Sequence, residues 1–109
     1  KSVLRRHTSN QQEQSVGYQG LILNLKSKSC EVDSAPVQLT RKEFEILQLL
    51  LSHPGIIFSR EEILSQVWHN EGIVLDRTVD VNITRLRKKI GRYGDRIVTR
   101  QGYGYGFEI

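Results

Sequence analysis

The chain has 109 residues, of which 38% are hydrophobic and 26% charged, and a net charge of +4 at pH 7. This length accommodates about one domain with a modest core, and no apolar run approaches the roughly 20 residues that a membrane helix requires. The basic N-terminus lacks the apolar stretch of a signal peptide. The single cysteine, Cys30, excludes an internal disulfide; we expect it to be a small buried hydrophobe in a cytoplasmic protein.

The positive charge is concentrated in the C-terminal third of the chain. Residues 77–100 hold eight Lys or Arg and two Asp, a local charge of +6, so the remaining residues sum to −2. A basic segment on a slightly acidic body favours attraction to a polyanion such as a nucleic acid, although an acidic protein would be attracted as well.

The first 15 residues, KSVLRRHTSNQQEQS, begin like the end of a basic helix and continue as a polar tract without periodicity. This composition predicts a linker. From residue 16, short alternating or β-branched segments are separated by turn residues at 26–28 and 33–34, which predicts a small antiparallel sheet. We therefore place the folded domain at residues 16–109.

Two helices are predicted by the same pair of signals. Thr40 and Ser59 are each followed three residues later by a glutamate, Glu43 and Glu62, which is the pattern of a capping box. Apolar residues at helical spacing follow each cap. We expect the first of these helices to end near the His-Pro-Gly sequence at 53–55.

A third helix is predicted to begin at Asp76, as its N-cap, and to run to about Ile90. At about 100° per residue four aliphatic side chains share one face, which we expect to be buried: Val79, Ile83, Leu86 and Ile90. The opposite face is cationic and carries no acid after Asp80. A solvated helix usually alternates Glu with Lys, so this pattern favours presentation of the face to a polyanion over simple solvation.

The order of side chains along this outer face is informative. Thr78, Val81 and Asn82 are compact and precede the long cations Arg85 and Lys88. A helix that enters a major groove needs short side chains near the base edges and long cations at the phosphates. Asn can pair with adenine, Arg can pair with guanine, and an apolar side chain can pack on a thymine methyl.

The last segment, RIVTRQGYGYGFEI, predicts a β-hairpin across residues 97–107 with Arg100, Gln101 and Gly102 at its tip. Such a wing can lie on a DNA backbone or enter a minor groove. The alternative is a glycine-rich strand whose aromatic residues only pack, and for Phe107 this is the interpretation we prefer.

Two residues near the second helix are candidate phosphate contacts. We expect Trp68 to pack in the core, although its indole N–H can donate from an exposed edge. Arg60, at the start of that helix, can reach a phosphate in the same way.

Residues that would support catalysis are poorly placed. His7, His53 and His69 lack metal-ligand spacing, and Cys30 has no evident histidine partner. We therefore expect no enzyme activity, no metal and no cofactor. A basic module that binds a protein stays as the alternative, whereas RNA is disfavoured because its A-form major groove excludes the helix.

Four segments, LTRKEFEILQLL, SREEILSQVW, DRTVDVNITRLRKKI and IVTRQGYGYGF, together resemble the C-terminal effector domain of OmpR/PhoB-type response regulators. The resemblance covers about residues 18–107. It implies an α+β winged helix-turn-helix with an N-terminal four-stranded antiparallel sheet, three helices and a C-terminal β-hairpin wing. The implied function is sequence-specific DNA binding that controls transcription in a bacterial two-component phosphorelay. Residues 1–6 would then be the remnant of a receiver domain's last helix.

The resemblance also implies roles for individual residues, with the recognition helix at 76–90 and the wing at 97–107. Base contacts are expected from Thr78, Val81, Asn82 and Arg85. Backbone contacts are expected from Trp68, Arg77, Arg87, Lys88, Thr99 and Tyr105. The wing residues Arg100 and Gln101 would lie at the minor groove. A loop that meets RNA polymerase would contain His69, Asn70, Glu71 and Gly72.

The partners that the resemblance implies are double-stranded DNA with direct repeats, RNA polymerase, and a histidine kinase acting through the receiver domain. We expect this chain to be monomeric alone and dimeric on DNA. Two positions depart from the family: Gln101 stands where some members have a minor-groove arginine, and Thr84 stands where a further cation is common.

Overall fold

The computed structural model describes residues 15–69 and 71–109, and the predicted linker at 1–15 lies outside this range except for Ser15. The N-terminal sheet has four antiparallel strands in sequence order: β1 (Ser15–Tyr18), β2 (Leu21–Asn24), β3 (Ser29–Val32) and β4 (Ala35–Val37). Three helices follow: α2 (Arg41–Ser52), α3 (Arg60–Val67) and α4 (Asp76–Lys89). A 3₁₀ helix, η1 (Gly91–Arg96), leads into the C-terminal hairpin of β5 (Ile97–Arg100) and β6 (Gly104–Phe107).

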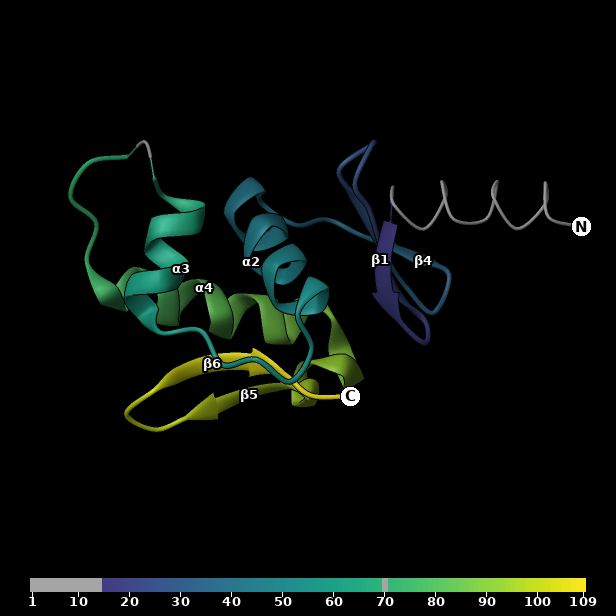
Figure 1. Ribbon diagram of the computed structural model, residues 1–109. Coiled ribbons are helices and arrows are strands. Elements are labelled where there is room, and N and C mark those ends of the chain that lie inside the picture. Colours follow the sequence, from purple (N-terminus) through teal and green to yellow (C-terminus); the bar gives the residue numbers. More distant parts are fainter. Residues whose placement is uncertain (1–14, 70) are drawn as a thin grey trace, which may run out of the picture.

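The sheet lies at one end of the molecule, and α3 and the tip of the hairpin lie at the other (Figure 1). The helix α4 packs against both α2 and α3, and Phe58, just before α3, pairs with Tyr105 of β6. This arrangement confirms the predicted α+β architecture with a sheet, three helices and a hairpin.

Tight turns make the N-terminal sheet a meander. The Asn24 side chain accepts hydrogen bonds from the backbone N–H groups of Lys26 and Ser27, both at 3.0 Å, which holds the β2–β3 turn. Leu21, Leu23 and Cys30 point from this sheet into the core. The prediction that Cys30 is a buried hydrophobe is confirmed, and burial, together with the charge of Glu31, raises the pKa of its thiol to about 11.

Both predicted capping boxes are present. The Thr40 hydroxyl accepts from the Glu43 N–H at 3.2 Å, and the Glu43 carboxylate accepts from the Thr40 N–H at 2.9 Å. Ser59 and Glu62 repeat the exchange at 3.0 and 2.8 Å. These reciprocal bonds satisfy backbone N–H groups that a helix start leaves without partners, which explains where α2 and α3 begin.

The start of α4 differs from the prediction. Leu75 is the N-cap, with extended backbone angles, and no side chain forms a cap hydrogen bond. Asp76 is the first helical residue, so the prediction that it caps the helix is wrong. Its carboxylate nevertheless lies at the positive end of the helix dipole. Because acids are enriched both in the first turn and at the N-cap, the sequence alone does not distinguish these two positions.

The predicted inner face of α4 is confirmed. Its four aliphatic side chains are essentially without solvent contact: Val79, Ile83, Leu86 and Ile90. Phe107 of β6 is also completely buried, as preferred from the sequence. The short helix η1 was not predicted, because its sequence GRYGDR contains two glycines and no apolar stripe. It buries Tyr93, whose hydroxyl accepts from the Gly20 N–H at 3.0 Å and so ties η1 to the N-terminal sheet.

A charged pair joins α2 to the far end of α4. Glu43 is completely buried, and its Oε1 accepts a hydrogen bond from Lys89 Nζ at 2.7 Å. Its Oε2 has no hydrogen-bond partner within residues 15–69 and 71–109. Burial acts to raise the pKa of Glu43, but the hydrogen bonds from Lys89 and Thr40 outweigh it and lower the pKa. The carboxylate is therefore ionised at neutral pH and depends on Lys89.

We predict that Lys89→Met lowers the free energy of unfolding by about 2–3 kcal/mol at pH 7, because it leaves a buried carboxylate without its cation. In the native chain the lowered pKa stabilises the fold above the ordinary pKa of Glu, and this stabilisation is lost as the pH falls through the lowered value. In the variant, burial without the cation raises the pKa of Glu43 instead. The deficit should therefore shrink between about pH 6 and pH 3.

Urea unfolding of both proteins across this pH range measures the deficit. Lys88→Met is the matched control, because Lys88 is exposed and makes no ion pair within the described part of the chain. A deficit that is equal in the two variants, or independent of pH, would contradict the role of the Glu43–Lys89 pair.

Candidate nucleic-acid interface

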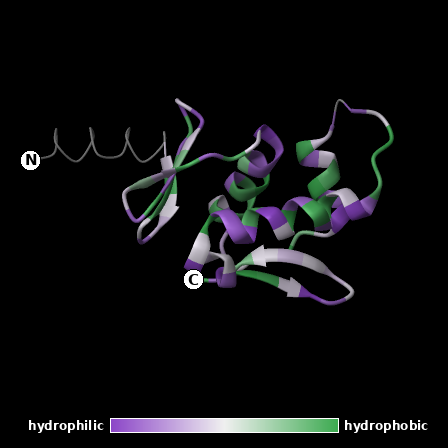
Figure 2. Cartoon of the chain, turned by 180° about the vertical axis from the view of Figure 1, so that it is seen from behind, coloured by the Kyte–Doolittle hydropathy of each residue, from purple (hydrophilic) through white to green (hydrophobic). Residues whose placement is uncertain are grey.

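The outer face of α4 is open to solvent. Arg77, Val81, Thr84, Arg85 and Lys88 are all exposed, and the aliphatic Val81 keeps 43% of its surface accessible. In Figure 2, hydrophilic and hydrophobic residues alternate along this helix, as expected when one side is buried and the other is not. Packing of the inner face therefore turns four of the predicted base and phosphate contacts towards solvent: Arg77, Val81, Arg85 and Lys88.

The cations of α4 and η1 differ in their partners. Lys89 and Arg92 are held by acids from other elements, Lys89 by Glu43 and Arg92 by Asp33 at 3.0 Å. Within residues 15–69 and 71–109, three exposed cations of α4 make no ion pair: Arg77, Arg85 and Lys88. On α4, the positive charge available to an external anion is therefore concentrated on these three side chains.

Two polar residues of the outer half of α4 bond to their own helix. One N–H of the Asn82 amide donates to the Thr78 carbonyl at 2.8 Å, and the Thr84 hydroxyl donates to the Asp80 carbonyl at 3.0 Å. Asn82 keeps its amide oxygen and a second N–H for a partner. Thr78 and Asn82 are half-buried, so they lie at the edge of the exposed face.

The wing is fastened to α4 by Arg87. Its guanidinium donates twice to the Ile97 carbonyl, at 2.7 and 3.2 Å, and once to the Thr99 hydroxyl at 2.8 Å. It also lies 5.9 Å from the centre of the Tyr105 ring. On its other side β6 is held by two backbone bonds between Tyr105 and Phe58, at 2.7 and 2.9 Å. Helix and wing therefore form one continuous surface.

The wing begins at Ile97, as predicted, but the turn at its tip begins one residue later than predicted. Arg100 ends β5 and pairs with Glu108 at 2.6 Å, so the turn consists of residues 101–103. The placement of Arg100 at the tip is thus wrong: its side chain is directed back along the hairpin, because the intervening residues of the partner strand on that face are glycines. Gln101 and Gly102 do lie in the turn, and the sequence did not single out Tyr103 there, which is 75% exposed.

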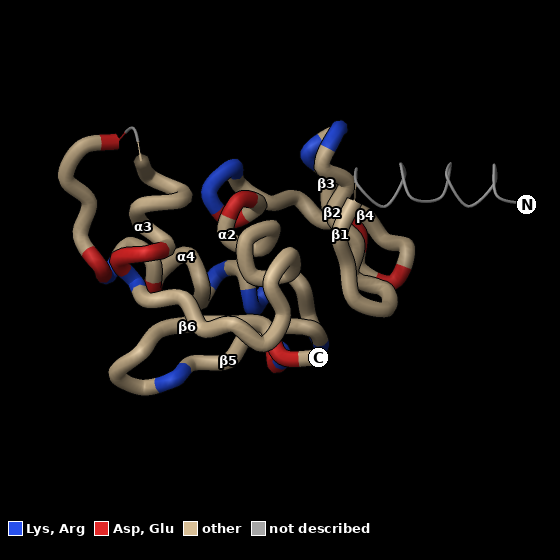
Figure 3. Tube along the Cα trace, in the orientation of Figure 1, with Lys and Arg blue, Asp and Glu red and all other residues tan. Residues whose placement is uncertain are grey.

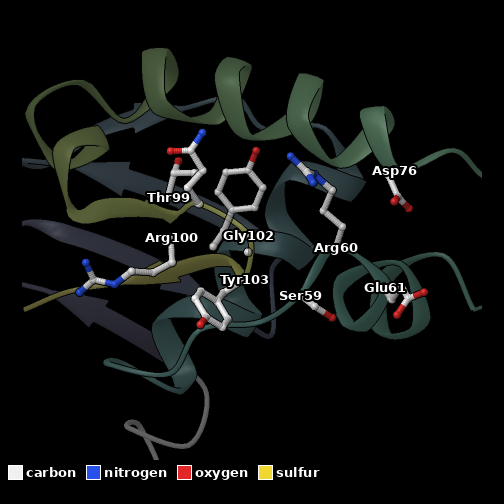
Figure 4. Close-up of a pocket in the computed structure, with 11 residues that line it drawn as sticks. Ser59, Arg60, Glu61, Asp76, Thr99, Arg100, Gly102 and Tyr103 are labelled. Atoms are coloured by element: carbon white, nitrogen blue, oxygen red, sulfur yellow. The ribbon is translucent and has the colours of Figure 1, made fainter.

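A cleft of about 590 Å³ separates the wing tip from the starts of α3 and α4. Figure 4 shows Arg60 pointing from α3 towards α4, with Thr99 and Tyr103 on the wing side. Gly104 lines this cleft with a left-handed φ of 139°, and a Cβ there would collide with the Phe58 carbonyl. Glycine is therefore required where β6 passes the segment that leads into α3.

Trp68 is packed in the core, as expected, with 8% of its surface exposed. Lys42 lies over its ring, 5.3 Å from the centroid, and donates to the Val67 carbonyl at 2.9 Å. Lys42 also bonds to Glu71 at 3.3 Å. The end of α3 and the beginning of the following loop are thus fixed by one lysine.

The loop between α3 and α4 is open to solvent. His69, Glu71 and Gly72 are exposed, and Ile73 is 98% exposed, whereas Asn70 lies outside the described residues.

Lysines and arginines are spread over α4, the wing, the β2–β3 turn and the start of α2 (Figure 3). Of these cations, Arg100 of the wing lines the cleft, together with Arg60 of α3.

Within residues 15–69 and 71–109 no group of three His, Cys, Asp or Glu side chains could hold a metal ion. In the same part of the chain no helix is long and apolar enough to cross a membrane.

A family described as transcriptional regulatory protein, C terminal, matches residues 34–107. The chain belongs to this family. The match covers α2, α3, α4 and the wing, and it confirms the resemblance to OmpR/PhoB-type regulators that the four sequence segments indicated.

Curated relatives share the sequence over nearly the whole chain. The phosphate regulon transcriptional regulatory protein PhoB of Shigella flexneri is 40% identical over 109 residues, covering 98% of this chain and 48% of the relative. The transcriptional regulatory protein SrrA of Staphylococcus aureus strain NCTC 8325 is 36% identical over 120 residues, covering 100% of this chain and 50% of the relative. The chain spans about half the length of the curated relatives it matches.

Solved structures share the fold. The response regulator DrrB of Thermotoga maritima, an OmpR/PhoB homologue, superposes with a TM-score of 0.79 at 29% identity, over 97% of this chain and 49% of that one. The RstA DNA-binding domain of Klebsiella pneumoniae, in complex with the RstA box, has a TM-score of 0.73 at 29% identity, over 86% of this chain and 96% of that one. These likenesses confirm the winged-helix architecture.

We predict that Arg87→Met, which keeps the aliphatic stem, loosens the wing. Loss of the bonds to Ile97 and Thr99 should speed amide hydrogen exchange in β5 and β6 by about tenfold or more, with little change in α2. Lys88→Met is the matched control, because Lys88 lies next to Arg87 in the chain, is exposed and makes no ion pair with the wing within the described residues. Equal exchange rates in both variants would show that Arg87 does not hold the hairpin.

Proposed function

We propose that this domain binds double-stranded DNA in a sequence-specific manner and acts as the output domain of a two-component response regulator. In this proposal α4 lies in the major groove, and the wing lies at the backbone or in the adjacent minor groove. The observation that carries it is the exposed outer face of α4, where Arg77, Arg85 and Lys88 make no ion pair within residues 15–69 and 71–109. The RstA relative solved in complex with the RstA box supports it.

The residue roles follow from position on α4. Thr78, Val81, Asn82 and Arg85 are proposed to contact base edges. Arg77 and Lys88 flank them and are proposed to contact phosphates, since long cations at the borders of a groove reach the backbone. Val81 supports this assignment, because an exposed aliphatic side chain amid cations has no value in water but can pack on a thymine methyl.

The proposed backbone contacts beyond α4 have different support. Thr99 is exposed on the wing, and Arg60 is exposed beside the cleft. Arg87 and Tyr105 are engaged in holding the wing, and Trp68 is largely buried. We therefore assign Arg87, Tyr105 and Trp68 mainly to holding the wing and α3 in place. Any phosphate contact would be made by the guanidinium, the hydroxyl or the indole N–H of these residues.

A second surface is proposed for the transcription machinery. The loop at 69–75 presents Ile73 almost fully to solvent, and Lys42 fixes its beginning through Val67 and Glu71. An exposed apolar side chain on an anchored loop is suited to contact with a protein, and we propose RNA polymerase. The competing function, a module that only binds protein, would use this loop but leaves the free cations of α4 unexplained.

For the intact protein we propose a cytoplasmic, non-enzymatic regulator whose receiver domain precedes this one and is addressed by a histidine kinase. The first 15 residues would be the linker with the remnant of that receiver's last helix. We further propose that the domain is monomeric alone and dimeric on direct repeats.

Fluorescence-anisotropy titration of the domain against random duplex and against duplexes selected from a randomised pool tests DNA binding. We expect affinity that falls steeply with salt and is greater for selected sites. Binding that is insensitive to salt, or equal for all sequences, would contradict the proposal.

Two substitutions test the roles within α4. Arg85→Ala should cost about 1–3 kcal/mol of binding free energy at the selected site and relax the preference at one base pair, because a base contact is lost. Lys88→Ala should weaken binding to all duplexes and lower the slope of log affinity against log salt by about 1. Indistinguishable behaviour of the two variants would refute the division into base and phosphate contacts.

A further inference from the structure

Asp80 is the one acid that α4 carries beyond its first residue. Its Oδ1 accepts a hydrogen bond from Arg60 Nε at 2.8 Å and another from the Tyr105 hydroxyl. Arg60 is the first residue of α3, and Tyr105 belongs to β6. A single carboxylate oxygen therefore joins α3, α4 and the wing at the edge of the proposed DNA-binding surface.

Asp80 is charged at neutral pH. Partial burial acts to raise its pKa, but the hydrogen bonds from Arg60 and Tyr105, with the charges of Arg60 and Arg77, outweigh it and lower the pKa. A negative charge on a helix that otherwise offers cations to phosphates would weaken DNA binding if left alone. Here Arg60 neutralises it.

The geometry leaves part of Arg60 available. Its Nε binds Asp80, and the guanidinium also makes a hydrogen-bond interaction with the Tyr105 hydroxyl. Because an arginine carries five N–H donors, most of those on its two terminal nitrogens are left for a further partner. The two side chains are 47% and 38% exposed, so the pair lies at the surface rather than in the core. An approaching phosphate meets both charges together, and they nearly cancel at a distance.

We propose that Asp80 is a positioning residue for sequence specificity. It offsets the charge of Arg60 towards distant phosphates and, together with Tyr105, orients the remaining N–H donors of Arg60. In this way it lowers affinity for random DNA more than affinity for a correctly docked site. The inference rests on the proposed function, duplex DNA binding by α4 and the wing.

The test compares Asp80→Asn with the native domain in anisotropy titrations against random duplex and a selected site. Asn keeps the size and an acceptor oxygen but removes the charge that offsets Arg60. Random-duplex affinity should rise about two- to fivefold, the range that exposed ion pairs are worth, and its salt slope should steepen by about 1. Affinity for the selected site should not rise in parallel, so the ratio of the two affinities falls.

Asp76→Asn is the matched control. Asp76 lies on the same helix and lines the same cleft, but it makes no ion pair within the described part of the chain. Loss of its charge should strengthen both affinities alike and leave their ratio unchanged. If Asp80 acted only by repelling phosphates, Asp80→Asn would likewise strengthen both affinities and leave their ratio unchanged.

Arg60→Lys provides a second variant, which serves even where Asp80→Asn does not fold. It keeps the charge but replaces the fork of the guanidinium by a point donor. The proposal expects random-duplex affinity within about twofold of native and a lower affinity for the selected site.

The outcomes separate the two hypotheses. A native domain that binds no duplex, or all duplexes equally, refutes the proposed function itself. If the native domain does discriminate between the two duplexes, the role of Asp80 is refuted when Asp80→Asn keeps the native ratio of selected-site to random-duplex affinity. If Asp80→Asn does not fold, the same result for Arg60→Lys refutes it. The same conclusion follows if Asp76→Asn lowers the ratio as much as Asp80→Asn does.

Discussion

Burial of one face of α4 is the constraint on which the rest of the structure depends. Val79, Ile83, Leu86 and Ile90 are essentially inaccessible to water, and burying each such side chain stabilises the fold by about 1.5–3 kcal/mol. An exposed ion pair contributes about 0–1 kcal/mol. The apolar stripe therefore sets the rotation of α4 about its axis, and the exposure of Val81 and Arg85 on the opposite side follows from it.

Burial of its apolar face does not fix how the neighbouring elements are oriented against α4. The polar contacts of α4 fix this orientation. On one flank Lys89 binds the buried Glu43 of α2. On the other, Asp80 and Arg87 bind the wing and the start of α3. These bonds are directional, so they fix orientation more than they add stability. The cations on the two flanks therefore bind other parts of the protein, whereas those on the outer face do not within the described part of the chain.

The sequence predicted the features that depend on residues close together in the chain. Both capping boxes are built within four residues, and the buried stripe repeats every three or four, so Thr40, Ser59 and Ile83 were assigned correctly. The N-cap of α4 was wrong because Asp76 suits both the cap and the first turn. The pairs Glu43–Lys89 and Asp80–Tyr105 could not be predicted, since their partners lie 46 and 25 residues apart and meet only through packing.

Because such long-range contacts cannot be seen in the sequence, the general location of the candidate site was predicted better than the partners of its individual residues. Charge and helical spacing identified the cationic face, but only the fold separates Lys89 and Arg92, which are neutralised by Glu43 and Asp33, from Lys88, which is not. Thr84 is exposed on this face, and its hydroxyl bonds to its own helix. The outer face thus combines few free charges with exposed compact side chains. A surface evolved only for attraction to polyanions would maximise charge, so this combination favours selectivity over strength of binding.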